Sequence, residues 1–297
     1  MIVFSIPVHE KAEVVIDQVR NFRHYVPGSL VVLHIARQWL VRDSTILGRL
    51  QGETGVVVNT GSLWTGYGDG SVLDAHVSNF RFALEQGMKF DYFCLHASND
   101  MFVRHGLPGY LARHDVGSFR FPIDGEMAAW THGASAGSDT VLRRLRRRAH
   151  DTGPVLSSQV EGSFYRTEIF ARFSEALAEV AGSSRLLPFG LPPSVRRPVQ
   201  RVFSFASRYR LLKKLSLGRF YPKEEVYPPT LMARSAVHPG SPYCFINWER
   251  NLEITIEDVV AIRSGSFRHD RYEEVFAVKR IERVLDDPVR SFIRGLS

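Results

Sequence analysis

Short apolar runs alternate with amphipathic helical patterns over residues 1–120 of the chain. The apolar runs lie at residues 2–6, 29–35, 55–59 and 90–96, and the helical patterns at 11–24 and 72–86. Two runs, Leu30–Leu33 and Tyr92–Leu95, are apolar throughout, as expected of strands buried on both faces of a parallel sheet. The alternation therefore predicts an α/β fold: an open, mostly parallel twisted sheet with helices on both faces.

The pattern becomes mixed after residue 120. Residues 125–140 are rich in Gly, Ala and Ser and predict a loop, whereas the arginine-rich residues 142–148 predict one exposed helix face. Residues 163–180 predict a helix with Thr167 as its cap. The proline-rich stretch 188–198 should then interrupt regular structure.

Cysteine content and hydropathy bear on where the protein works. The two cysteines, Cys94 and Cys244, both lie in apolar runs, which predicts buried free thiols and argues against a disulfide framework. The chain begins without a basic segment followed by a long apolar one, and no apolar run approaches the ~20 residues of a membrane span. We therefore expect a cytoplasmic protein.

The net charge of +7 comes from one segment of the chain. Nine of the 38 basic residues lie within 185–220, which has no acidic residue, so the rest of the chain carries 29 basic and 31 acidic residues. Within this segment, residues 199–217 have the pattern of a basic amphipathic helix. Residues 196–219 are therefore a candidate contact with the inner face of an anionic membrane. The alternative is a helix packed on the domain with a solvated basic face. No nucleic-acid-binding motif accompanies the charge, and nucleic acid is not an expected partner.

Polar residues follow the ends of the predicted strands. Ligands of open α/β sheets bind at the carboxyl edge of the strands, which makes these residues a candidate site. The alternative is ordinary loop polarity. The residues are Pro7, His9, Glu10, His34, Asn59, Asn99 and Asp100.

Four ordered groups of segments resemble the core-2/I-branching N-acetylglucosaminyltransferase and peptide xylosyltransferase family. They are residues 7–10 with 33–36; 63–75 with 90–100; 221–231; and 246–248 with 276–279. The third reads Tyr-Pro-Lys-Glu-Glu-Val-Tyr-Pro-Pro-Thr-Leu, and the last pair contains Ile-Asn-Trp and Phe-Ala-Val-Lys. In the second strand segment the family's usual acid is replaced by Ala36.

The resemblance implies a GT-A fold and an inverting glycosyltransferase that needs no metal. The family's general base precedes a threonine by five residues, so Glu225, counted back from Thr230, inherits that role. Lys279 matches the lysine that binds the donor diphosphate. The family's second phosphate-binding residue, an arginine, has no clear counterpart, and Arg250, Arg263 and Arg268 remain candidates. Glu161 falls where the family contacts the acceptor.

The chemistry of inversion fits these residues. One carboxylate must take the proton of the acceptor hydroxyl, and positive charge must stabilise the leaving diphosphate. Many GT-A enzymes hold a divalent metal with an Asp-x-Asp motif, but this sequence has none and carries Ser98-Asn99-Asp100 instead. We therefore expect no metal cofactor, with Lys279 and an arginine supplying the charge.

Each candidate also has a structural interpretation. Glu225 follows Pro222 and could simply be a first-turn helix acid. Asn99 and Asp100 could hold sugar hydroxyls or close a turn, and Trp64 and Trp248 could stack on sugar rings or pack in the core.

The expected activity is transfer of a sugar from a nucleotide-sugar donor, with a UDP-sugar favoured, to a saccharide or lipid-linked saccharide in bacterial surface polysaccharide or glycolipid synthesis. We expect a single domain, 1–297, with a nucleotide-sugar half (1–120) and an acceptor-binding and catalytic half (121–297). The alternative function is a non-catalytic GT-A-like protein that binds a glycan or nucleotide sugar.

Overall fold

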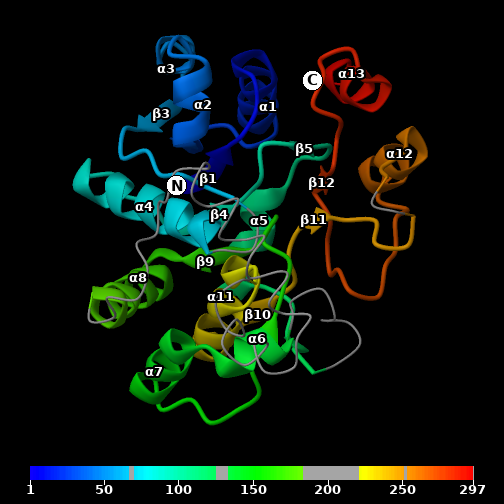
Figure 1. Ribbon diagram of the computed structural model, residues 1–297. Coiled ribbons are helices and arrows are strands. Elements are labelled where there is room, and N and C mark those ends of the chain that lie inside the picture. The colour runs from blue at the N-terminus through cyan, green and yellow to red at the C-terminus, as the bar shows by residue number, and fades with distance from the viewer. Residues whose placement is uncertain (67–69, 125–132, 183–220, 251–252, 297) are drawn as a thin grey trace, which may run out of the picture.

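A seven-stranded sheet forms the centre of the computed structural model, which describes residues 1–66, 70–124, 133–182, 221–250 and 253–296 (Figure 1). Its order is β10-β6-β9-β4-β1-β2-β3. The strands are β1 (Ile2–Val8), β2 (Leu30–Ile35), β3 (Val56–Asn59), β4 (Tyr92–Leu95), β6 (Val116–Gly117), β9 (Phe164–Arg166) and β10 (Pro239–Gly240). Pairing is parallel throughout except on the two sides of β9, which runs antiparallel to β4 and β6.

Helices cover both faces of this sheet, because neighbouring residues of the central strands point to opposite sides. Phe4 and Leu33 pack on one face with α1 (Ala12–Tyr25), α3 (Ile46–Gln51) and α5 (Leu107–Leu111). Val3 and Val32 pack on the other face with α4 (Ser71–Glu85), α7 (Thr140–Arg148) and α8 (Thr167–Gly182). The predicted α/β architecture with a largely parallel, helix-covered sheet is confirmed.

A second sheet joins distant parts of the chain. It has the order β11-β12-β5, with β5 (Asp100–Phe102) antiparallel to β12 (Ala277–Lys279) and β11 (Cys244–Phe245) parallel to β12. Its own apolar cluster includes residues of α12 (Ile256–Ser264) and α13 (Pro288–Arg294), which lie beside it in Figure 1. This sheet carries residues 100 and 279 to one place.

Short helices and a two-stranded pair position the segment around Glu225. The two-stranded pair β7 (Phe121–Pro122) and β8 (Leu156–Ser157) lies next to α11 (Tyr227–Met232). A 3₁₀ helix, η2 (Lys223–Glu225), precedes α11, and another, η3 (Ala233–Ser235), follows it. The Thr230 hydroxyl donates to the carbonyl of Leu156 (3.0 Å) and accepts from its N–H (2.9 Å), which ties α11 to β8.

Two expectations about local structure were wrong, and one region had no prediction. Residues between β2 and β3, for which the sequence pattern predicted no element, form α2 (Arg37–Arg42) and α3. Helix α6 (Gly133–Ser138) forms where a loop was predicted. The predicted helix at 163–180 begins at Thr167, because the preceding residues pair with β4 as strand β9. The Thr167 hydroxyl donates to the Phe90 carbonyl (2.6 Å), so it ties the helix start to the segment before β4.

Both thiols are free and buried, as predicted. None of the helices in the described ranges is long and apolar enough to cross a membrane. The proline-rich stretch 188–198 and the basic segment 196–219 lie outside the described residues, so the membrane-contact interpretation remains a prediction.

Candidate functional site

A lysine and two buried carboxylates form the centre of the candidate site. The Lys279 ammonium group is ion-paired with Glu161, and their side chains are only 17% and 12% exposed. Lys279 is also the register partner of Asp100 across the antiparallel β12–β5 pair. Directly opposed residues in such a pair point to the same face, so Asp100 faces the same site as Lys279.

Opposing effects act on the charge of Lys279. Burial alone would lower the pKa of its ammonium group, but the carboxylates of Glu161 and Asp100 outweigh burial and leave the pKa raised. Glu225 contributes to the same rise. Lys279 is therefore a fixed cation, and the Glu225 carboxylate lies close enough to act on it.

Backbone contacts position Glu225 beside the loop that carries Glu161. The Glu225 carbonyl accepts a hydrogen bond from the Ser158 N–H (2.8 Å), and Thr230 is bonded to Leu156 as described above. Residues 225–230 thus run alongside residues 156–158, three residues before Glu161. Glu225 lies at the end of η2 and is partly exposed.

The neighbouring Glu224 has a different environment. It is buried, and its Oε2 atom has no hydrogen-bond partner among the described residues. Burial raises the pKa of Glu224 to about 8, with further contributions from the nearby charges of Glu225, Glu161 and Asp74. Burial also raises the pKa of Asp74 to about 6, while Lys223 opposes that rise. Glu224 is consequently a neutral carboxylic acid at pH 7.

A buried hydrogen-bonded chain supports Asp100. His96 Nδ1 lies 2.9 Å from Asp100 Oδ2, and His96 Nε2 lies 2.7 Å from the Tyr243 hydroxyl. The Ala97 N–H also donates to Asp100 Oδ2 (2.9 Å), whereas Oδ1 has no partner among the described residues. Burial raises the pKa of Asp100, although its hydrogen bond with His96 opposes the rise. Sequence reasoning missed His96 and Tyr243; the available signal was a histidine four residues before the strand-end aspartate.

The polar residues predicted at the sheet edge are largely occupied in structural roles. Asn59 donates to Ser78 (2.9 Å) and Asn79 (3.1 Å) of α4, and Pro7 is buried within β1. His9 Nδ1 lies 3.5 Å from the Thr65 hydroxyl.

His34 is the exception among these edge residues. Its Nε2 accepts from the Leu63 N–H (3.1 Å), which assigns the ring proton to Nδ1. Nδ1 is buried without a partner among the described residues, and burial lowers the pKa of His34 to about 4. His34 therefore offers an unused buried donor at the end of β2.

An arginine that sequence reasoning missed lies at this edge. Glu10, just after β1, accepts from Ser98 (3.3 Å) and pairs with Arg283 (2.8 Å). Ser98 follows β4, so the Glu10 contact links the ends of β1 and β4. Arg283 comes four residues after Lys279. The only sequence signal for it was its position close to the Phe-Ala-Val-Lys segment.

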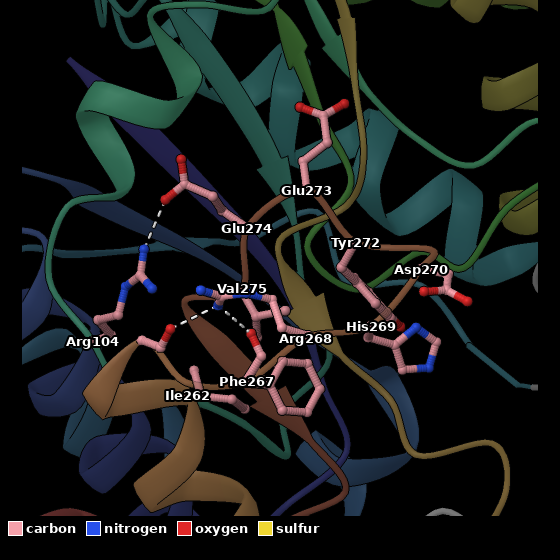
Figure 2. Close-up of a pocket in the computed structure, with 11 residues that line it drawn as sticks. Arg104, Ile262, Phe267, Arg268, His269, Asp270, Tyr272, Glu273, Glu274 and Val275 are labelled. Atoms are coloured by element: carbon pink, nitrogen blue, oxygen red, sulfur yellow. Dashed lines mark hydrogen bonds and ion pairs between the residues drawn. The ribbon is translucent and has the colours of Figure 1, made fainter.

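The arginines named from sequence are engaged elsewhere. Arg250 pairs with Asp258 (2.6 Å), and Arg263 bonds the Tyr25 hydroxyl (3.0 Å). Arg268 donates to the carbonyls of Gly265 (2.7 Å) and Phe267 (2.8 Å) and lines a different pocket, of about 560 Å³ (Figure 2). No contact between described residues joins any of these three arginines to Lys279.

The remaining candidates stay as predictions. Trp64 and Trp248 are both partly exposed. Asn99 is buried, and its Oδ1 atom lacks a partner within the described ranges. Nowhere in the described part of the chain do three or more His, Cys, Asp or Glu side chains gather as they would around a metal ion.

The arrangement combines a fixed cation, a partly exposed carboxylate and a neutral buried acid within electrostatic reach of one another. Such a set can neutralise an anionic group and accept a proton beside it. The sequence matched none of the protein-family models, and a search of curated proteins gave no significant match.

Proposed function

We propose that the protein is an inverting glycosyltransferase that moves a sugar from a nucleotide-sugar donor to a saccharide hydroxyl without a metal ion. The observation that carries the proposal is the position of Lys279, a largely buried cation beside Glu161 and Asp100. The Glu225 carboxylate also raises the pKa of Lys279. The sequence resemblance assigns the base and the diphosphate-binding lysine to these two residues.

In the proposed reaction, Glu225 accepts the proton of the acceptor hydroxyl while that oxygen bonds to the anomeric carbon of the donor. The bond from this carbon to the diphosphate oxygen breaks on the opposite face, and its electron pair leaves with the diphosphate. Lys279 stabilises the charge that develops there. One carboxylate suffices, and the product has inverted configuration.

The ion pair with Glu161 adds a requirement to this scheme. The donor diphosphate would have to replace Glu161 as the counterion of Lys279. Glu161 would then be free to hydrogen-bond an acceptor hydroxyl, the role that the resemblance suggests for it. Arg283, which pairs with Glu10 just after β1 and comes four residues after Lys279 in the sequence, is a candidate to assist Lys279.

The same pair is an argument against turnover, because a lysine already neutralised by Glu161 stabilises the charge that develops on a leaving diphosphate less strongly. The two functions differ in turnover. A catalyst should release nucleoside diphosphate from its donor, whereas a binding protein should only retain the nucleotide sugar.

A donor-hydrolysis screen tests the proposal. The full chain is incubated with UDP-, GDP-, TDP- and CMP-sugars in EDTA, and release of the nucleotide is measured. We expect slow hydrolysis of one UDP-sugar that survives chelation. Activity that strictly requires Mn²⁺ would contradict the metal-independent mechanism, and tight binding without turnover of any donor would support the alternative.

A further inference from the structure

The pocket beside Arg268 has the chemistry of a sugar-binding site. Its volume of about 560 Å³ falls within the range of ~300–1,000 Å³ that is usual for ligand pockets. Figure 2 shows Arg104 and Glu274 on one side and His269, Asp270 and Tyr272 on the other. The pocket lies outside the Lys279 centre described above.

Two aromatic rings give the pocket a flat apolar wall. The Phe267 and His269 ring planes are within 20° of parallel, with centroids 6.3 Å apart, and both side chains are partly exposed. The buried Phe245 meets Phe267 edge-on at 4.7 Å, and the buried Tyr272 meets His269 edge-on at 5.2 Å. These contacts hold the rings in place, as a platform for the apolar face of a pyranose requires.

The charged groups of the pocket are close to balanced. Two arginines, Arg104 and Arg268, line the pocket with Asp270, Glu273 and Glu274, and a third, Arg113, pairs with Glu274 from outside the lining. Glu274 already pairs with Arg104 (2.7 Å), while Asp270 is exposed and has no ion pair or hydrogen bond with described residues. A phosphate would therefore gain no net attraction here, whereas sugar hydroxyls can donate to a carboxylate.

A hydrogen-bonded relay connects the pocket to the Lys279 centre. The Tyr272 hydroxyl donates to Gln159 Oε1 (2.8 Å), and Gln159 Nε2 donates to the Glu161 carbonyl (2.7 Å). Tyr272 therefore lines the pocket on one side and supports the Glu161 loop on the other.

We infer that this pocket binds a neutral saccharide, and that it holds the sugars of an oligosaccharide acceptor that lie away from the reacting hydroxyl. The acceptor role rests on the proposed function; saccharide binding itself does not. The acceptor is accordingly a chain of at least two sugars, uncharged where it meets the Phe267–His269 wall.

The test measures binding alone. The full chain is screened on an array of neutral, sulfated and sialylated oligosaccharides, and the best ligand is titrated by calorimetry against wild type and variants. We expect a neutral oligosaccharide to bind, with Phe267→Ala weakening it roughly tenfold or more. Asp270→Ala should weaken it several-fold, and because Asp270 is exposed this variant keeps the test valid if Phe267→Ala folds poorly.

Matched controls lie elsewhere on the chain. Phe82→Ala removes a partly buried phenylalanine of α4, and Asp286→Ala removes an exposed aspartate, so both should bind within twofold of wild type. Binding confined to charged glycans, unchanged affinity in both pocket variants, or no glycan bound at all would overturn the inference. A different result is that the protein binds a glycan through Phe267 but turns over no donor. That result would contradict the proposed function and still support a saccharide as the ligand of the pocket.

Discussion

Lys279 lies directly opposite Asp100 in the antiparallel pair of β12 and β5, so a lysine and a wholly buried aspartate share one face of the small sheet. Glu161 completes the set from the loop before β9. The two carboxylates keep the lysine charged in a place where burial alone would favour its neutral form.

Removing Lys279 should destabilise the protein strongly. In Lys279→Met the buried carboxylates of Glu161 and Asp100 lose their cation, and such a loss costs about 3 to 5 kcal/mol of the free energy of unfolding. Urea unfolding at pH 7 measures it. The double variant Lys279→Met/Glu161→Gln should recover part of the loss, and a cost below about 1 kcal/mol for the single variant would show that the pair is not a buried one.

Replacing Glu225 should separate turnover from binding. Glu225→Gln keeps the size of the side chain but cannot take up a proton, so donor turnover should fall by about 100-fold or more. The Kd of the donor, measured by calorimetry, should change little. Glu175→Gln, at an exposed site on α8, serves as the control. Full activity in Glu225→Gln would remove Glu225 from the mechanism.

Glu224 should make stability depend on pH. Its pKa of about 8 in the folded state exceeds the ordinary value of 4.5, so the folded protein holds an extra proton between these values. Stability should therefore fall as pH rises from about 4.5 to 8 and then level off. In Glu224→Gln the loss between pH 5 and pH 9 should shrink by on the order of 4 kcal/mol, since one pH unit corresponds to about 1.4 kcal/mol. Urea unfolding at both pH values measures this, and an identical decline in wild type and variant would contradict it.

Gly162, next to Glu161, should tolerate no side chain. Its φ is +74°, and an added Cβ would collide with the backbone nitrogen and Cβ of Cys244. Gly162→Ala should lower the free energy of unfolding by about 3 kcal/mol or more, combining backbone strain with overpacking. Gly87 is a matched control: its φ is +71°, but no atom lies within 4 Å of the Cβ position, so Gly87→Ala should cost only about 1 kcal/mol. Equal losses in thermal or urea unfolding would contradict the close packing at Gly162.

The central parallel strands could be predicted from the sequence because they are continuous apolar runs. The runs at residues 30–35 and 92–95 became β2 and β4 in the central sheet. Helix α2 was missed because it buries no residue and so shows no apolar period. The start of the predicted helix at residue 163 was wrong because Phe164 and Tyr165 are apolar whether they lie in a strand or a helix, and only their pairing with β4 decides between the two.

Less of the candidate site could be predicted from the sequence, because its geometry depends on contacts between residues far apart in the chain. Lys279 and Glu225 came from the family resemblance, and nothing in the sequence linked Lys279 to Glu161. Glu224 and Glu225 are adjacent and chemically alike, and only the fold makes one a neutral buried acid and leaves the other partly exposed.

The order of strands also has a consequence for biosynthesis. Every strand of the seven-stranded sheet has been synthesised by residue 240, but β12, which carries Lys279, is made nearly last. A nascent chain can therefore assemble its main sheet while Asp100 and Glu161 still lack their cation. Truncation before residue 277 should yield a protein with most of its strand content and without Lys279.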